Sequence, residues 1–304
     1  MVESNMLTGK TWVRYRNGNY MVSINLKDGT KIRANNLDHF TPDFPESMDL
    51  KITDYCDMNC PMCHENSSIR GKHGRIMELE FIDKLHPGTE LAIGGGNPLE
   101  HPDILPFLVK CKKLNLIPSM TVNQKHFEDN LEILRHMVEN NLIYGLGISL
   151  TSPTDKFIEK LADFPSAVIH VIAGLVSIRD LEKLSNKGLK ILILGYKQFR
   201  RGKTLFDINS HVITDEIRDL AYKLPTIIKE GWFEVVSFDN LAIQQLEPRR
   251  ILTKEQYDEF YMGDDGFATM YVDAVKEEFA RSSTSTDRYP IKDNIKDMFE
   301  VIRT

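Results

Sequence analysis

Cys56-Asp57-Met58-Asn59-Cys60-Pro61-Met62-Cys63 is the stretch on which the interpretation of this chain depends. Three of the four cysteines stand within these eight residues, and the fourth is Cys111. Such crowding is a poor layout for disulfide bonds and a natural one for a metal centre. One loop with this spacing can hold three thiolates around a compact iron–sulfur cubane, and the missing fourth cysteine leaves one iron without a protein ligand. We therefore predict that Cys56, Cys60 and Cys63 bind a 4Fe–4S cluster.

Two other interpretations of the cysteines are open. A zinc site would add His64 or His73 to the three thiolates, although zinc sites usually pair two Cys-x-x-Cys units and this stretch has one. Three cysteines packed as ordinary apolar residues are a second alternative. Asp57, Asn59 and Pro61 make the stretch too polar and irregular for a core element, which disfavours that alternative. Cys111, within a helical pattern, is expected to be a small buried thiol.

Short apolar runs alternate with helical patterns on both sides of the cysteines, which is typical of a parallel sheet with crossover helices. Strands are expected near 49–53, 90–94, 117–122, 145–150, 167–172, 190–194 and 233–237. Helices are expected at 77–85, 104–114, 127–139, 154–161, 177–185 and 214–229. Such a pattern fits a barrel or an open doubly wound sheet, and periodicity does not separate the two. In both, ligands gather at the carboxyl ends of the strands.

The regions outside this pattern are smaller. Segments 12–15 and 20–24 are separated by an Asn-Gly turn, and a further turn leads into 30–33, which predicts an antiparallel meander. The tail offers a strand-like run at 269–275 and a closing helix at 291–302. We therefore expect an α/β chain with an N-terminal β meander in residues 1–45, a main domain in 46–240 and a mixed extension in 241–304.

Composition limits the possible partners. With 304 residues, 41% of them hydrophobic, the chain can bury one sizeable core. A net charge of -6 argues against a surface built throughout for nucleic acid. A local basic excess is present in the meander, at Lys10, Arg14, Arg16, Lys27, Lys31 and Arg33, and a second one at Arg200, Arg201 and Lys203. Solvated surface is the expectation for both. No leader or apolar span is evident, so we expect a cytoplasmic protein that does not enter a membrane.

The three-cysteine spacing closely resembles the cluster motif of the radical SAM superfamily. The resemblance extends to the segment Leu91-Ala92-Ile93-Gly94-Gly95-Gly96-Asn97-Pro98-Leu99-Glu100-His101-Pro102-Asp103, which is similar to that family's second strand and its Gly-Gly-Glu-Pro loop. It implies a partial (β/α)6 barrel similar to a TIM barrel. It also implies that the loop backbone at Gly94, Gly95, Gly96, Asn97 and Pro98 binds the methionine end of S-adenosylmethionine (SAM). Glycines permit the close approach that this requires.

This sequence departs from the family at Asn97, where the family usually has Glu. An amide oxygen accepts a hydrogen bond but brings no charge, so the attraction for an ammonium should be weaker. The resemblance further implies SAM contacts by Met62, Asn123 and Ser149. Tyr196 and Lys197 end a later strand and have two interpretations, a ligand contact and surface. His64, Glu65 and Asn66 closely follow the last cysteine and could face the substrate, but support of the cysteine loop is the expected role.

What the resemblance implies for the chemistry is reductive cleavage of SAM at the cluster, which gives a 5'-deoxyadenosyl radical that abstracts hydrogen from the substrate. Cys56, Cys60 and Cys63 are the predicted catalytic residues in this sense, and a flavodoxin or ferredoxin is the expected reductant. No cysteine follows Cys111, which disfavours auxiliary clusters. A peptide, a nucleic acid and a small metabolite remain open as substrates, with a slight preference for a macromolecule, which the basic meander favours. Its strand edge could add a peptide strand, and the aromatic residues Trp12, Tyr15 and Tyr20 are expected to be exposed and able to stack on bases. The alternative functions are a non-catalytic SAM- or metal-binding module and a zinc-stabilised adaptor.

Overall fold

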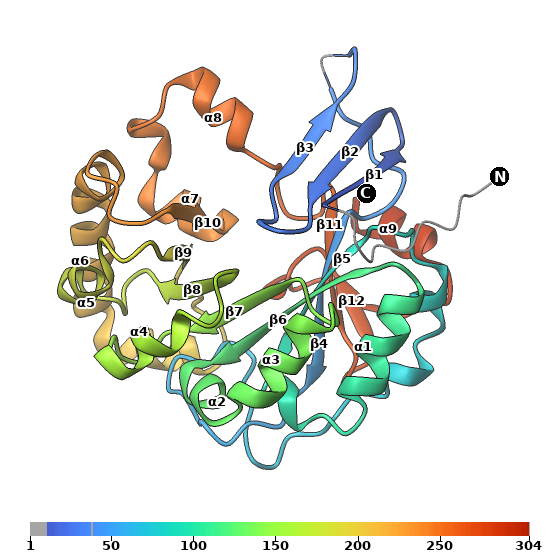
Figure 1. Ribbon diagram of the computed structural model, residues 1–304, viewed down its shortest axis with the longest axis horizontal. Coiled ribbons are helices and arrows are strands. Elements are labelled where there is room, and N and C mark those ends of the chain that lie inside the picture. Colours follow the sequence, from blue (N-terminus) through green and yellow to red (C-terminus); the bar gives the residue numbers. More distant parts are fainter. Residues whose placement is uncertain (1–10, 38, 304) are drawn as a thin grey trace.

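A ten-stranded sheet forms the centre of the chain in the computed structural model, which describes residues 11–37 and 39–303 (Figure 1). Its order is β10-β9-β8-β7-β6-β5-β4-β11-β12-β13, and neighbouring strands from β10 to β11 pair in parallel. The strands are β4 (Ser47–Thr53), β5 (Glu90–Gly95), β6 (Ile117–Asn123), β7 (Gly145–Ser149), β8 (Ala167–Ile172), β9 (Lys190–Leu194), β10 (Val235–Phe238), β11 (Thr269–Asp273), β12 (Glu278–Ala280) and β13 (Tyr289–Pro290). The parallel order confirms the α/β class that the alternating pattern predicts.

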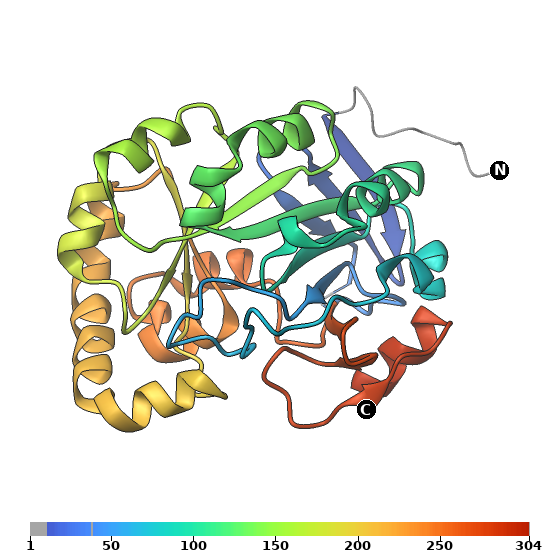
Figure 2. The same cartoon turned by 90° about the horizontal axis from the view of Figure 1, so that it is seen from below.

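The helices are α1 (Ile104–Lys113), α2 (Gln124–Asp129), α3 (Leu131–Glu139), α4 (Asp155–Leu161), α5 (Ile178–Leu184), α6 (Arg201–Lys229), α7 (Asn240–Leu246), α8 (Lys254–Phe260) and α9 (Ile295–Arg303). Most of them cover one face of the sheet, whereas α8 stands apart from it (Figures 1 and 2). Short 3-10 turns are η1 (Ile76–Glu78), η2 (Glu80–Lys84), η3 (Pro98–Glu100) and η4 (Pro248–Arg250). None of the helices that the structure describes is both long and apolar enough to span a bilayer.

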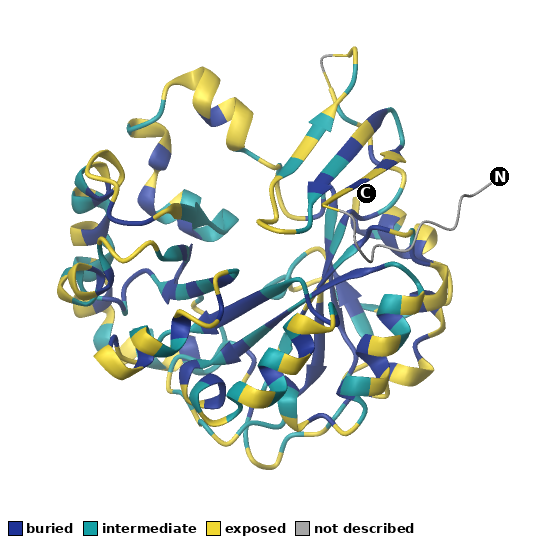
Figure 3. Ribbon diagram, viewed as in Figure 1, coloured by how far each residue is buried: buried dark blue, intermediate teal, exposed yellow. Residues whose placement is uncertain are grey.

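Buried and more accessible residues alternate along many of the strands (Figure 3), because successive side chains of a strand point to opposite faces of the sheet. Ile93, Val122, Ile148, Ile169 and Ile193 are almost wholly buried in the main hydrophobic core. Their neighbours along each strand project from the other face, which we call the inner face. On β5, β6 and β7 these neighbours are polar or small, whereas β8 and β9 also present Val168, Leu192 and Leu194, and many of them remain partly accessible to solvent.

The sheet is open. Among the described residues β10 pairs with β9 alone and β13 with β12 alone, so the two edge strands do not close a barrel. A closed barrel is therefore not what this sequence forms. The extension also differs from a separate appendage, because β11 lies directly beside β4 and continues the parallel order. Strand β11, from late in the sequence, thus lies beside β4, the strand that leads into the cysteines.

A second, three-stranded sheet is formed by β1 (Trp12–Asn17), β2 (Tyr20–Asn25) and β3 (Lys31–Ala34) in antiparallel order. It confirms the predicted meander. Its charges are partly engaged, since Lys31 and Arg33 form ion pairs with Glu46. Tyr15 and Tyr20 are buried, with exposed fractions of 6% and 2%, so the expectation that they are exposed to stack on bases is wrong.

Several predicted elements differ in extent. The expected helix at 77–85 is two 3-10 turns, and that at 127–139 breaks at Asn130 into α2 and α3. Helix α6 begins at Arg201, well before the predicted start, and contains a kink at Asn209. Helices α7 and α8 were not predicted. Each of these short helices has an oxygen cap, Asp239 or Thr253, which is the local signal that could have revealed it.

Candidate metal centre

The three cysteines lie in a loop that leaves the carboxyl end of β4 and folds back on itself. The Cys56 amide donates to Ser68 O at 3.0 Å, and within the loop the Cys63 amide donates to Cys60 O at 3.2 Å. All three thiols are partly buried. Burial raises the pKa of the Cys60 thiol, and the nearby sulfurs of Cys56 and Cys63 raise it further. The three sulfurs therefore share one local environment.

The spacing of the thiols does not match a zinc ion. Zinc–sulfur bonds of about 2.3 Å in a tetrahedron bring thiolates to within roughly 4 Å of one another. Among the described residues, the group with three candidate ligand atoms within 4.8 Å consists of Cys56, Asp57 and His126 and leaves out Cys60 and Cys63. Asp57 is already engaged, because its carboxylate accepts from His126 Nε2 at 2.6 Å. Neither His64 nor His73 joins the cysteines in such a group.

The glycine loop at the end of β5 lies directly against the start of the cysteine loop. The Gly96 amide donates to Thr53 O at 2.8 Å, and the Asn97 amide donates to Tyr55 O at 2.6 Å. A Cβ atom at Gly96 would lie 2.0 Å from Tyr55 O, so this approach requires glycine. The two motifs that the sequence suggested are thus held together by backbone hydrogen bonds.

Asn97 has a structural role of its own. Its side chain is buried, with 3% exposed, and its Oδ1 accepts from the Leu99 amide at 3.2 Å to cap η3. Pro98 follows as the first residue of that turn. His101 continues the anchoring, because its Nε2 donates to Gly74 O at 2.8 Å. At the position where the resembled family usually has Glu, Asn97 therefore brings no charge, and its side chain caps the turn that leaves the loop.

Two of the predicted SAM contacts belong to one row across the inner face. Asn123 on β6 pairs in register with Ser149 on β7, and Ser149 pairs with His170 on β8. All three residues are partly accessible. Asn123 also caps α2, since its Oδ1 accepts from the Lys125 amide. The parallel register therefore aligns polar side chains from three adjacent strands, one of which, His170, the sequence analysis missed.

His170 lies over a glycine. A Cβ atom at Gly147 would be 2.6 Å from His170 Nε2 and 2.8 Å from Thr121 Oγ1, so the absent side chain is what admits the imidazole. Burial lowers the pKa of His170 to about 4. The ring is neutral near pH 7 and offers one donor and one acceptor to a polar, uncharged group. A histidine within an apolar strand was the available sequence signal.

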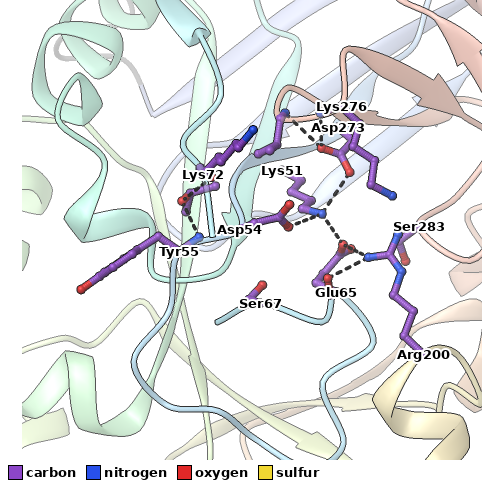
Figure 4. Close-up of polar contacts among 12 residues, drawn as sticks. Lys51, Asp54, Tyr55, Glu65, Ser67, Lys72, Arg200, Asp273, Lys276 and Ser283 are labelled. Atoms are coloured by element: carbon purple, nitrogen blue, oxygen red, sulfur yellow. Dashed lines mark hydrogen bonds and ion pairs between the residues drawn. The ribbon is translucent and has the colours of Figure 1, made fainter. Parts of the chain in front are cut away.

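A buried ion cluster underlies the cysteine loop (Figure 4). Lys51 on β4 has an exposed fraction of 3%, and its Nζ lies 2.6 Å from Asp54, 2.9 Å from Glu65 and 3.0 Å from Asp273. Burial alone would lower the pKa of Lys51, but Glu65 and its other carboxylate partners outweigh burial and raise it. The cluster joins β4 to β11 and to both ends of the cysteine loop.

Glu65 is the branch point of this cluster. It accepts from Tyr271 Oη at 3.1 Å and pairs with Arg200 Nη1 at 3.3 Å. Burial by itself raises the pKa of Glu65, whereas His64 and Lys51 lower it further than burial raises it, so the carboxylate stays charged. Glu65 therefore supports the loop, as expected.

The start of α6 closes over the other side of the loop. Arg200 donates to Glu65 O at 2.7 Å, and Arg201 donates to Asn59 Oδ1 and Ser67 O at 2.6 and 2.8 Å. A Cβ atom at Gly202 would lie 3.2 Å from Met62 O. The expectation that these arginines are solvated surface is wrong. It holds for Lys203, which is exposed and pairs with Asp207.

Tyr196 and Lys197 take different directions. Tyr196 is buried, with 2% exposed, and its hydroxyl donates to Gly202 O at 2.8 Å, which supports α6. Lys197 Nζ lies 3.4 Å from His64 Nε2 and donates to Ser283 Oγ at 3.0 Å. The two side chains therefore have different partners, and Lys197 is the one that approaches His64, next to Cys63.

Buried polar atoms around the cysteines fit a bound inorganic group. Arg201 Nε, His126 Nδ1 and Ser67 Oγ are buried without a hydrogen-bond partner among the described residues. Because His126 Nε2 donates to Asp57, Nδ1 is the acceptor nitrogen of the neutral ring. Arg201 Nε and Ser67 Oγ are donors, and an unsatisfied buried donor costs about 1–3 kcal/mol, so these two indicate that a further acceptor belongs there. Sulfides and thiolates of a cluster would supply such acceptors.

Comparison with known proteins agrees with this geometry. Residues 50–196 match the profile of the Radical SAM superfamily, whose cofactors are a 4Fe–4S cluster and SAM. Among solved structures, Streptococcus suis SuiB bound to the precursor peptide SuiA is similar at 13% identity and a TM-score of 0.63, covering 95% of this chain and 87% of that one. SuiB bound to SAM is similar at 12% identity and a TM-score of 0.61, covering 96% and 85%. No curated protein matches this chain.

Replacing Lys51 by Met should strongly destabilise the protein, because Asp54, Glu65 and Asp273 would lose their shared cation. We expect the free energy of unfolding to fall by about 3–5 kcal/mol. Urea denaturation of the metal-free protein measures it, with Lys203→Met as the matched control, since the exposed Lys203–Asp207 pair should contribute less than about 1 kcal/mol. Equal losses in the two variants would contradict the importance of the cluster.

Gly96→Ala should separate the glycine loop from the cysteine loop, because its Cβ would meet Tyr55 O at 2.0 Å. Overpacking of this kind costs about 1–3 kcal/mol or more. We expect less iron and sulfide per chain after anaerobic reconstitution. Gly94→Ala is the control, since a Cβ there meets nothing within 4 Å. Full iron retention by Gly96→Ala would show that contact between the loops is dispensable.

His170 should make stability depend on pH. Its folded pKa of about 4 lies below the value of about 6.5 in an unfolded chain, so between these values the unfolded state binds more protons. Stability should therefore fall as pH is lowered from 6.5 to 4, and His170→Gln should remove about 2 kcal/mol of that fall. His211→Gln, whose side chain is 92% exposed in the wild type, is the control. Parallel stability profiles for wild type and His170→Gln would refute the burial argument.

Proposed function

Because residues 50–196 form a radical SAM domain, we propose that this chain is an enzyme that cleaves SAM and abstracts hydrogen from a peptide substrate. The observation that carries the proposal is the pair of backbone hydrogen bonds from Gly96 and Asn97 to the residues just before Cys56. They bring the predicted cluster ligands and the predicted methionine-binding loop to one end of the sheet. Orphaned donors around the cysteines support the same assignment.

The proposed ligands of the cluster are Cys56, Cys60 and Cys63. When bound, the cluster and SAM together supply a 5'-deoxyadenosyl radical by reductive cleavage, with a flavodoxin or ferredoxin as the proposed reductant. The chain's own residues bind and orient: the backbone of Gly94, Gly95 and Gly96 at the methionine end, and Asn123 and Ser149 at the nucleoside. We assign the inner face of the curved sheet from β4 to β9 as the partial barrel that encloses these ligands.

Asn97 and Pro98 act in this proposal through the backbone of the loop. The Asn97 side chain is committed to the Leu99 amide, so it stiffens the loop exit instead of attracting an ammonium by charge. Met62 is retained as a proposed adenine contact on the sequence resemblance, and its backbone packs against Gly202. The buried Lys51 ion cluster fixes both ends of the cysteine loop in place. A degenerate binding module would not require such a rigid loop.

A peptide is the proposed substrate class. Strand β3 is an edge of the three-stranded sheet, paired with β2 on one side, and the nearby apolar side chains Ile32 and Leu37 are 51% and 55% exposed. An exposed edge of this kind can add a peptide strand through main-chain hydrogen bonds. SuiB, which is similar over most of this chain, was solved with a precursor peptide, and we extend that peptide chemistry to this chain as part of the proposal.

The structure disfavours nucleic acid as the substrate. Of the aromatic residues considered for base stacking, Tyr15 and Tyr20 are buried and Trp12 is 38% exposed. Lys31 and Arg33, two of the basic residues in the meander, pair with Glu46, which reduces the positive field that a phosphate backbone would need. A peptide needs neither feature.

The test is transfer of deuterium. Short peptides from reading frames that flank the coding sequence are prepared with deuterated side chains and incubated anaerobically with reconstituted protein, SAM and dithionite. We expect deuterium in 5'-deoxyadenosine and a matching mass change in one peptide, both followed by mass spectrometry. Cys60→Ala is the control and should give neither product.

Two outcomes would count against the proposal. Wild-type protein that holds no iron and sulfide, or never forms 5'-deoxyadenosine with any substrate, would remove the enzymatic function. Deuterium transfer from an RNA oligonucleotide but from no peptide would leave the enzyme class intact and overturn the peptide assignment.

A further inference from the structure

Arg201 lies across the cysteine loop and binds it on both sides of the ligands. Its Nη1 donates to the Oδ1 of Asn59, which stands between Cys56 and Cys60, and its Nη2 donates to Ser67 O, which follows Cys63. Asn59 has a φ of 45°, a left-handed conformation that the hydrogen bond helps to hold. The guanidinium is therefore fixed against the segment that carries all three thiols.

The third donor nitrogen of the guanidinium group, Arg201 Nε, is buried and makes no hydrogen bond to the described residues. Leaving such a donor unsatisfied costs about 1–3 kcal/mol, more for a charged group. The adjacent cations are engaged elsewhere, because Arg200 pairs with Glu65 and Lys197 donates to Ser283. An acceptor in the cysteine loop would satisfy Nε.

The charge of Arg201 lies beside the cysteine loop. Hydrogen bonds to Asn59 Oδ1 and Ser67 O hold its guanidinium against the segment that carries the three thiols. Arginine does not lose its charge at any ordinary pH. A cluster held by three thiolates is anionic, and reduction adds one more negative charge. A fixed cation beside it therefore stabilises the reduced state more than the oxidised state.

Resting on the proposed function, we propose that Arg201 is the charged hydrogen-bond partner of the 4Fe–4S cluster, which orders the cysteine loop and raises the reduction potential of the cluster. It is a positioning residue that acts through the cluster and its loop. Arg200, one residue earlier, supports Glu65 and does not take this role. Arg200 thus holds Glu65 at the end of the loop, and Arg201 places a positive charge beside the thiols.

The experiment compares full-length wild type, Arg201→Gln, Arg201→Lys and the control Lys203→Gln, which removes an exposed cation two residues further along α6, all reconstituted anaerobically. Iron and sulfide per chain are measured first, and the midpoint potential of the cluster is then measured by redox titration with EPR detection, without SAM. We expect Arg201→Gln to lose at least tenfold in reduced-state stability, a shift of about 59 mV to more negative potential. Arg201→Lys should shift less, and Lys203→Gln should stay near wild type.

The outcomes separate this proposal from the one on which it rests. A wild type without iron and sulfide removes both. A full cluster whose potential is the same in wild type and Arg201→Gln overturns the role of Arg201 and leaves the enzyme class standing. If Arg201→Gln assembles no cluster, Arg201→Lys is the deciding variant. A midpoint potential near that of the wild type supports the role of the positive charge, and a shift of about 59 mV or more, which is tenfold in reduced-state stability, overturns that role. Weaker SAM binding by Arg201→Gln at an unchanged potential, measured by calorimetry, would assign the arginine to the carboxylate of SAM and also overturn the proposal.

Discussion

One buried ammonium holds the functional end of this protein together. Lys51 Nζ contacts Asp54, Glu65 and Asp273, which belong to the two ends of the cysteine loop and to a strand more than 200 residues later in the chain. Buried charges are tolerated only when they are paired and hydrogen-bonded. The requirement to satisfy this one cation therefore fixes where the loop begins, where it returns and which strand lies beside β4.

The loop is also held from its other sides. Glycine-loop amides bind the residues ahead of Cys56, and the first residues of α6 bind Asn59, Glu65 and Ser67. A segment with three thiols and little regular structure would otherwise have many conformations, at a cost of about 1–2 kcal/mol per ordered residue. Contacts from β4, β5, β11 and α6 are what make a single loop geometry favourable.

The two sides of the site differ in charge. Beneath and around the cysteines lie paired ions, with Arg200 and Arg201 facing the loop. Across the inner face the row from Asn123 through Ser149 to His170 is uncharged, since burial keeps the imidazole neutral near pH 7. A neutral polar surface suits a nucleoside and a reactive carbon centre, whereas the charged loop suits an anionic inorganic group. The fold keeps these environments apart by placing one on the loop and the other on the strands.

The sequence by itself determined the α/β class, most strand positions, the meander, the cysteine motif and the glycine loop, because each of these depends on local periodicity, turn chemistry or short spacing. It also identified Cys111 as a buried thiol, which the structure confirms. Only the tertiary structure decided the partners of Lys51, the roles of Arg200 and Arg201, and the place of His170 over Gly147. These depend on strand register and on contacts between residues far apart in the chain. Periodicity assigns a face to each side chain, but it carries no information about which distant element covers that face.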